Sequence, residues 1–288
     1  MSVKVVGCML AVGWLMHGGA ARAGNAFTDP VEGGPATPFR VVPAWDAALL
    51  VLDLGVITGL KHVVSHPHED GERGELWAID APVVAWGIHD DARRSSDMGA
   101  MMAVAFGVVD SAITQKHDGW RSGAIKFTLY AESALTTSAL TEIVKQTVQR
   151  PRPCTYQPER RYREGLACSP TDDDAYLSFF SGHTATTAAL SATATYMAFR
   201  EDSEGGSRGP LTLAGGLALT GFVAAERMRA GKHFPTDVLT GAAVGAAVGV
   251  LVPHLHFSAR GSSSPSGGAR GSAMLSSDGQ MLGVAGVF

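Results

Sequence analysis

Three short segments of this sequence combine cations, histidines and a carboxylate in a way that suits transfer of a phosphoryl group. They are residues 145–153, 178–184 and 226–237. A phosphoryl group in transfer spreads negative charge over three oxygens, so a protein mainly has to supply positioned cations and hydrogen-bond donors. Lys145, Arg152 and Arg227 would supply three cations. Arginine suits bidentate contact with phosphate oxygens, whereas lysine acts as a point charge.

The two histidines of these segments could carry the covalent chemistry. His233 is the candidate nucleophile, because Pro235 is well placed to open a helix whose first turn would hold Asp237. We expect that carboxylate to lie within reach of the imidazole, where it would fix the tautomer and raise the nucleophilicity of the other ring nitrogen. His183 would protonate the departing alkoxide and later activate the water that cleaves the phosphohistidine.

Ser181 and Gly182 come directly before an apolar run with helical spacing. Free backbone N–H groups and the positive end of the helix dipole bind anions at such a position. Gly182 has no side chain, so the backbone there can come close to a ligand. We therefore expect these two residues to complete the phosphate-binding set.

Together the three segments resemble the tripartite signature of the type 2 phosphatidic acid phosphatase superfamily, which also contains bacterial class A acid phosphatases and vanadium haloperoxidases. That signature reads Lys-x6-Arg-Pro, then Pro-Ser-Gly-His, then Ser-Arg-x5-His-x3-Asp. The resemblance covers about residues 125–252. It implies a helical bundle that hydrolyses a phosphate ester or lipid diphosphate through a phosphohistidine. It also implies that no metal or other cofactor is needed and that vanadate inhibits.

The sequence departs from the signature at two positions. Phe180 stands where the family usually has Pro, which only stiffens the approach to the loop, so we expect little chemical consequence. Glu226 stands where the family usually has Ser, and a carboxylate beside Arg227 would weaken anion binding if it pointed inward. We expect it to face a neighbouring helix or solvent. The signature assigns no role to Arg229 or Lys232, which lie in the same segment.

Other charged residues near the segments have simpler interpretations. We interpret four arginines as solvated or rim charges: Arg150, Arg160, Arg161 and Arg163. A second group resembles a metal site in composition: His62, His66, His68, Glu69 and Asp70. Because Pro67 breaks any regular ligand face, a polar surface loop is the favoured interpretation.

Apolar residues recur at helical spacing through most of the chain, without the period-two alternation of strands. Helices are predicted near residues 45–59, 79–89, 98–115, 125–149, 183–199, 210–230 and 235–252. Pro151 and Pro153 end the helix that carries Lys145. The pattern predicts an all-α domain over residues 44–256, after an extended lead-in at 24–43 and before a flexible Gly/Ser-rich tail at 257–288.

The start of the chain resembles an export signal. Lys4 is followed by a short apolar run at residues 5–16, and Ala21-Arg22-Ala23 offers a cleavage site. We therefore predict a signal peptide over residues 1–23 and a location in the periplasm or on the periplasmic face of the cell envelope. A short membrane anchor or a buried first helix is the alternative.

Two cysteines remain after that cleavage, Cys154 and Cys168. In an exported chain such a pair indicates a disulfide, here closing a loop worth about 3 kcal/mol in the loop-entropy model. Two free thiols or half of a metal site are the alternatives, although the nearby Cys or His that a metal would want is lacking.

Membrane association is left open by the sequence. Residues 209–225 and 238–259 are uncharged stretches near the length needed to span a bilayer. The second stretch carries a ladder of small residues, Gly241, Gly245 and Gly249, which lets helices approach closely. Both stretches are rich in Ala, Gly and Thr rather than Leu, and other helices carry aspartates, so a soluble or peripheral protein is favoured.

Composition and length limit the remaining function classes. A formal net charge of −4 argues against a general nucleic-acid binder. A vanadium haloperoxidase is the rival enzyme, since vanadate mimics a pentacoordinate phosphate, but those enzymes are usually much longer than 288 residues. A non-catalytic envelope protein that binds a phosphorylated lipid would need only the cations. The partner expected is thus a phosphorylated small molecule or lipid substrate.

Overall fold

The structure, a computed structural model, describes residues 37–62, 75–86, 88–156, 168, 174–202 and 205–258. Its elements are α2 (Pro43–His62), α3 (Ala81–Ala85), α4 (Asp90–Asp118), α5 (Trp120–Val148), η1 (Pro153–Tyr156), α7 (Gly182–Glu201), α8 (Arg208–Arg229) and α9 (Pro235–Leu255). Within those residues the only β-type pairing is one isolated bridge, between Phe39 and Phe257. The all-α fold class is confirmed. The predicted signal peptide, most of the lead-in, the His62–Asp70 loop beyond His62 and the tail after Ser258 lie outside the described residues.

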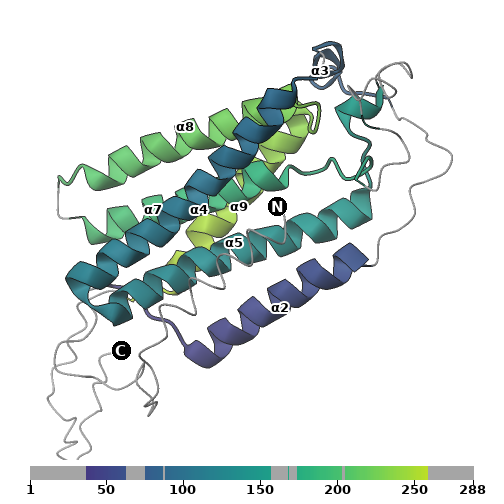
Figure 1. The fold of residues 1–288 in the computed structure, drawn as a ribbon. Coiled ribbons are helices and arrows are strands. Elements are labelled where there is room, and N and C mark those ends of the chain that lie inside the picture. Colours follow the sequence, from purple (N-terminus) through teal and green to yellow (C-terminus); the bar gives the residue numbers. More distant parts are fainter. Residues whose placement is uncertain are drawn as a thin grey trace, which may run out of the picture. The chain divides into compact units, whose positions relative to one another are not determined.

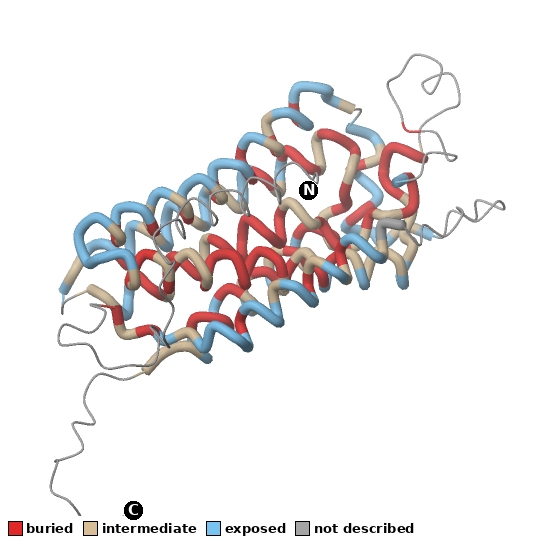
Figure 2. Tube along the Cα trace, turned by 60° about the horizontal axis from the view of Figure 1, so that its bottom comes forward, coloured by how far each residue is buried: buried red, intermediate tan, exposed pale blue. Residues whose placement is uncertain are grey.

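Helix α7 lies at the centre of the helical packing. It contacts α9, α8, α5 and α4, while α2 packs along α5 (Figure 1). The buried stretches gather on the sides of the helices that face one another, as Figure 2 shows. Because α5, α7, α8 and α9 each carry part of one predicted segment at an end, this packing can bring the three segments together.

Small residues on α9 allow the closest of these contacts. A side chain at Gly241, Gly245 or Gly249 would collide with backbone atoms of α7. The predicted ladder therefore works inside the bundle, where it lets α9 lie directly on α7. This places Asp237 of α9 beside the start of α7, and the Ser181 N–H donates to the Asp237 carbonyl oxygen at 3.1 Å.

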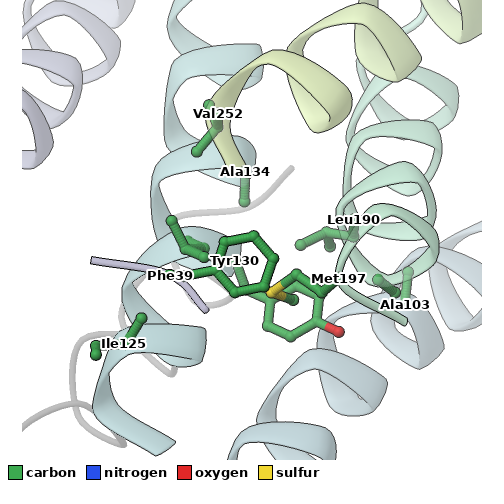
Figure 3. Close-up of a cluster of buried hydrophobic side chains, with 10 residues drawn as sticks. Phe39, Ala103, Ile125, Tyr130, Ala134, Leu190, Met197 and Val252 are labelled. Carbon is green, nitrogen blue, oxygen red and sulfur yellow. The ribbon is translucent and has the colours of Figure 1, made fainter. Parts of the chain in front are cut away.

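The main apolar core lies between α5, α7 and the segment before α2. Phe39, from the predicted lead-in, is fully buried against Tyr130, Leu190 and Met197 (Figure 3). Its backbone pairs with Phe257, so the segment before α2 and the segment after α9 meet at this core. The last part of the lead-in is thus a packed element of the fold, which its Pro- and Gly-rich composition did not indicate.

In the described part of the chain, three helices are long and apolar enough to cross a membrane, judged by length and composition: α2, α4 and α9. They differ from the two stretches singled out in the sequence, since α8 is not among them and α2 and α4 are added. Many large apolar side chains on these helices are exposed, including Trp45, Val51, Leu52, Met98, Met101, Leu239 and Leu255.

Candidate active site

The three segments converge on one cavity of about 360 Å³. It is lined by residues from α4, α5, α7, α8 and the connecting loops: Arg93, Asp97, Ala100, Met101, Val104, Lys145, Arg152, Asp174, His183, Arg227 and Lys232. Four of the predicted residues therefore share its wall, namely Lys145, Arg152, His183 and Arg227. Positive charge dominates this wall, since the two carboxylates are outnumbered by the lysines and arginines.

The three predicted cations are held where water solvates them poorly. Burial, together with neighbouring cations, lowers the pKa of Lys145 to about 8 and that of Arg227 to about 10. Among the described residues, Arg152 forms one ion pair, to Asp174 at 3.1 Å. The Nε atoms of Arg152 and Arg227 have no hydrogen-bond partner among the residues that the structure describes. Such a group of buried donors can stabilise an oxyanion.

His233 is fully buried, and its Nδ1 lies 2.7 Å from the backbone oxygen of Ser178. A carbonyl oxygen only accepts, so Nδ1 carries the hydrogen and Nε2 keeps its lone pair. Burial lowers the pKa of His233 well below its usual value, and Arg227, Arg152 and Lys145 lower it further. The imidazole is thus neutral, lies among the three cations, and has the tautomer that a nucleophile at Nε2 requires.

Asp237 contacts His233 only indirectly, through the Ser178 segment. The direct contact between the carboxylate and the imidazole that we expected from the sequence is not formed. Its Oδ2 is 3.8 Å from Nδ1 of His233, too far for a hydrogen bond. That oxygen instead accepts from the Ser178 hydroxyl at 2.5 Å and from the Phe234 N–H at 2.9 Å. Asp237 therefore caps α9 and holds in place the Ser178 segment whose carbonyl orients the imidazole.

Arg150 and Asp80 do not line the cavity, but they form a group of ion pairs and hydrogen bonds with Asp237. Arg150 bonds Asp237 at 2.5 Å and Asp80 at 2.6 Å, so the interpretation of this arginine as a solvated or rim charge was wrong. Asp80 is fully buried and also accepts from the Thr236 N–H at 3.1 Å and hydroxyl at 2.7 Å. The other three arginines of that group lie outside the described residues.

His183 pairs with a residue that the sequence analysis missed. Its Nε2 is 2.8 Å from Oδ1 of Asp97 on α4, and the same oxygen is 3.8 Å from Arg227. Burial lowers the pKa of His183 to about 3, although the hydrogen bond to Asp97 acts in the opposite direction. The imidazole is therefore neutral at neutral pH and donates to Asp97. Asp97 belongs to none of the three segments, and no spacing pattern in the sequence indicated that it would contact His183.

Residues 126–260 match the family model described as the PAP2 superfamily. This part of the chain belongs to the PAP2 superfamily. A comparison with curated proteins and a comparison with solved structures each returned no match. The matched range contains all three predicted segments but neither Asp80 nor Asp97. Membership supports phosphatase-type hydrolysis of phosphorylated substrates.

At the start of α7, the PAP2 domain uses one of its predicted anion donors for another purpose. The Ser181 N–H bonds Asp237, so the free N–H groups of this first turn begin at Gly182. A side chain at Gly182 would lie 3.1 Å from Thr141 and 3.8 Å from Nζ of Lys145. Thr141 therefore limits a side chain at this position, and the Lys145 ammonium group lies close to the helix N-terminus, so that both attract the same anion.

Glu226 is turned away from the cations of the PAP2 site. Its Oε1 is 2.6 Å from Arg229, one turn further along α8. The expectation that it faces elsewhere fits this geometry, although its partner belongs to its own helix. Lys232, to which the signature gives no role, lines the cavity, and burial lowers its pKa to about 8.

A disulfide lies beside the loop of the third segment. The structure joins Cys154 and Cys168, whose Cα atoms are 5.3 Å apart. The Cys154 N–H donates to the carbonyl oxygen of Gly231 at 3.0 Å, and Gly231 has a φ of 63° that favours glycine. This hydrogen bond therefore joins η1, which carries Cys154 of the disulfide, to the turn between Arg227 and His233.

Proposed function

We propose that this protein is a metal-independent phosphatase that hydrolyses a phosphomonoester or a lipid-linked phosphate or diphosphate through a phosphohistidine at His233. The observation that supports this most strongly is the placement of a neutral, correctly oriented His233 among Lys145, Arg152 and Arg227. Binding a phosphate would need only the cations. A fully buried imidazole whose Nε2 lone pair is kept available is what nucleophilic attack requires in addition.

The first half of the proposed reaction transfers the phosphoryl group to the enzyme. Arg152, Arg227, Lys145 and the first N–H groups of α7 hold the phosphate oxygens. Nε2 of His233 forms a bond to phosphorus while the bond from phosphorus to the leaving oxygen breaks. The Nδ1–H bond to Ser178 stabilises the positive charge that develops on the ring. His183 gives its proton to the departing oxygen.

The second half releases phosphate. His183, now without the proton that it gave away, takes one from a water molecule, whose oxygen attacks phosphorus. The bond between phosphorus and Nε2 breaks, which returns His233 to the neutral form and His183 to the protonated form. Charge on the three equatorial oxygens is again compensated by the three cations.

Protonation of His183 is coupled to substrate binding in this scheme. Before substrate binds, its pKa of about 3 keeps the imidazole neutral at neutral pH. A phosphate dianion placed beside it favours the imidazolium form, as Asp97 already does. The imidazolium form of His183, which is the acid, is therefore present mainly when a phosphate is bound.

The surroundings of the site support a substrate at a membrane. Helices α2, α4 and α9 are long and apolar enough to enter a bilayer, and large apolar side chains on them are exposed. We propose that the protein associates with the cell envelope and works on its periplasmic side. The disulfide fits an oxidising compartment.

A turnover assay with a generic aryl phosphate tests the proposed chemistry. We expect activity to survive EDTA, at a temperature where the chelated protein stays folded, and to fall with micromolar vanadate. Loss of activity on chelation, with recovery on adding a divalent metal, would contradict the metal-free mechanism. Halide oxidation with vanadate and peroxide would instead identify a haloperoxidase. A panel of phosphatidic acid, undecaprenyl diphosphate, lipid A and soluble monoesters then defines the substrate.

A further inference from the structure

A second group of buried ionisable side chains lies away from the phosphate site. It consists of Asp46 in the first turn of α2, Glu132 in the middle of α5 and His256 directly after α9. One ligand atom from each lies within 4.8 Å of the others. Glu132 and Lys145 are separated along α5 by about 20 Å of helix. The group therefore takes no part in the phosphoryl chemistry.

The carboxylates of this group lack the partners that buried charges normally have. Glu132 is 0% exposed, and neither of its carboxylate oxygens has a hydrogen-bond partner among the described residues. Oδ2 of Asp46 is in the same state. In the described part of the chain no Lys or Arg forms an ion pair with either carboxylate. Burying such groups without compensation is strongly unfavourable.

The imidazole of His256 is oriented toward these two carboxylates. Its Nδ1 lies 2.8 Å from the carbonyl oxygen of Val252, so this nitrogen donates and Nε2 is the nitrogen that faces the carboxylates. Nε2 is 3.3 Å from Asp46, within hydrogen-bond distance, and 3.6 Å from Glu132. When the imidazole is neutral with its hydrogen on Nδ1, Nε2 and the two carboxylates present three acceptors to one point. A backbone carbonyl that fixes the far ring nitrogen is also the usual outer contact of a histidine that binds a metal.

We propose that Asp46, Glu132 and His256 bind a divalent transition-metal cation, with Zn²⁺ the best match to this set of donors. An imidazole with two carboxylates suits Zn²⁺, whereas Mg²⁺ and Ca²⁺ prefer oxygen ligands alone. Tetrahedral ligands at the usual Zn²⁺ distances lie about 3.4 Å apart, close to the observed 3.3 and 3.6 Å.

An ion can reach this group from one side, and a bound ion would join three helices. The Asp46 and His256 side chains are 11% and 17% exposed, so a cation and a water ligand can reach them from that side. A bound cation would compensate these carboxylates and join the start of α2 and the end of α9 to α5.

Metal binding to the purified full chain without a polyhistidine tag tests this proposal. The protein is stripped with a chelator and dialysed, and Zn²⁺ is then added while bound metal and thermal stability are measured. We expect one equivalent of Zn²⁺ and a rise in Tm of about 5 °C or more at saturating metal. Turnover of an aryl phosphate, measured well below Tm, should be the same with and without the metal.

Variants separate this site from any other that binds Zn²⁺. Glu132→Gln and Asp46→Asn each remove a ligand charge with little change in shape, and each should weaken binding by roughly 100-fold. The matched control is Asp53→Asn, which changes a buried carboxylate of α2 that is hydrogen-bonded to Thr136 and is not a ligand. It should bind Zn²⁺ as the unmodified chain does.

Two outcomes would overturn the proposal. One is Zn²⁺ binding that is equal in the unmodified chain, Glu132→Gln and Asp46→Asn, since the metal would then be bound elsewhere. The other is an unmodified chain that neither binds Zn²⁺ nor gains stability from it.

Discussion

Helix α5 carries two buried charged groups of opposite kind. Near its end, Lys145 joins Arg152 and Arg227 around a cavity in which cations exceed carboxylates. At its middle, Glu132 faces Asp46 and His256, where carboxylates exceed cations. Unbalanced buried charge is unfavourable in both places. Each group is therefore best explained by a counter-ion from outside the chain, a phosphate in the first and a metal cation in the second.

A third group of charges, buried except for the 43%-exposed Arg208, shows what a purely structural arrangement looks like. Lys126 is 2.7 Å from Glu201 and 3.5 Å from Asp110, and Arg208 bonds the same two carboxylates at 3.0 and 2.8 Å. Two cations meet two carboxylates, so nothing from outside is needed. We infer from the comparison that imbalance of charge, more than burial of charge, distinguishes the two proposed ligand sites.

The largest effect should come from removing the nucleophile. His233→Ala takes away the atom that becomes phosphorylated while leaving the three cations, so we expect kcat on an aryl phosphate to fall by at least about 10⁴-fold. Phosphate binding, measured by calorimetry, should be retained, and circular dichroism checks the fold. A variant with substantial turnover would show that the cations alone account for the chemistry.

Removing the acid should have the next largest effect, and one that depends on the leaving group. For His183→Ala we expect kcat/KM to fall by about 10³-fold on an alkyl phosphate and far less on nitrophenyl phosphate, whose leaving group needs no proton. The ratio kcat/KM is the quantity to compare because it reports the first chemical step alone. Equal losses on both esters would remove the acid role from His183.

The ion pairs of Arg150 with Asp80 and Asp237 should matter mostly for stability. Arg150→Ala leaves Asp80 and Asp237 as buried carboxylates without their cation, so we expect a loss of about 3 kcal/mol in the free energy of unfolding. The matched control is Arg229→Ala, which removes a 44%-exposed arginine from its pair with Glu226 and should cost less than about 1 kcal/mol. Urea denaturation measures both. Similar losses would mean that Arg150 is no more important than a surface charge.

The smallest effect is a pH dependence on the alkaline side. The pKa of Lys145 is lowered to about 8, so its charge is present below pH 8 and is lost as pH rises through that value. We therefore expect kcat/KM of the unmodified chain to decline above about pH 8. Lys145→Arg should retain activity to higher pH. If Lys232→Arg does so instead, the titrating cation is Lys232, whose pKa is also about 8.

The two candidate catalytic histidines and the three cations could be singled out because they lie in contiguous segments with fixed spacing. Helical periodicity likewise indicated the all-α fold, and Gly241, Gly245 and Gly249 indicated a close helix contact. These features depend on local sequence, so they can be predicted without knowledge of the tertiary structure.

The supporting residues could not be predicted, because they come from elements distant in the sequence. Asp97 meets His183 only because α4 packs against α7 and α8. Asp80 precedes the short helix α3 and has no partner nearby in the sequence. The orientation of His233 by a carbonyl of Ser178, in place of Asp237, depends on backbone geometry that side-chain types do not encode.

Trapping the phosphoenzyme tests the central claim most directly. The protein is mixed with substrate, quenched in alkali within milliseconds, digested and analysed by mass spectrometry, because phosphohistidine survives base and is lost in acid. The account predicts a phosphate on the peptide that contains His233, absent from His233→Ala and accumulating in His183→Ala when a nitrophenyl ester is used. Phosphate on His183, or rapid turnover with no phosphorylated peptide at any time, would contradict it.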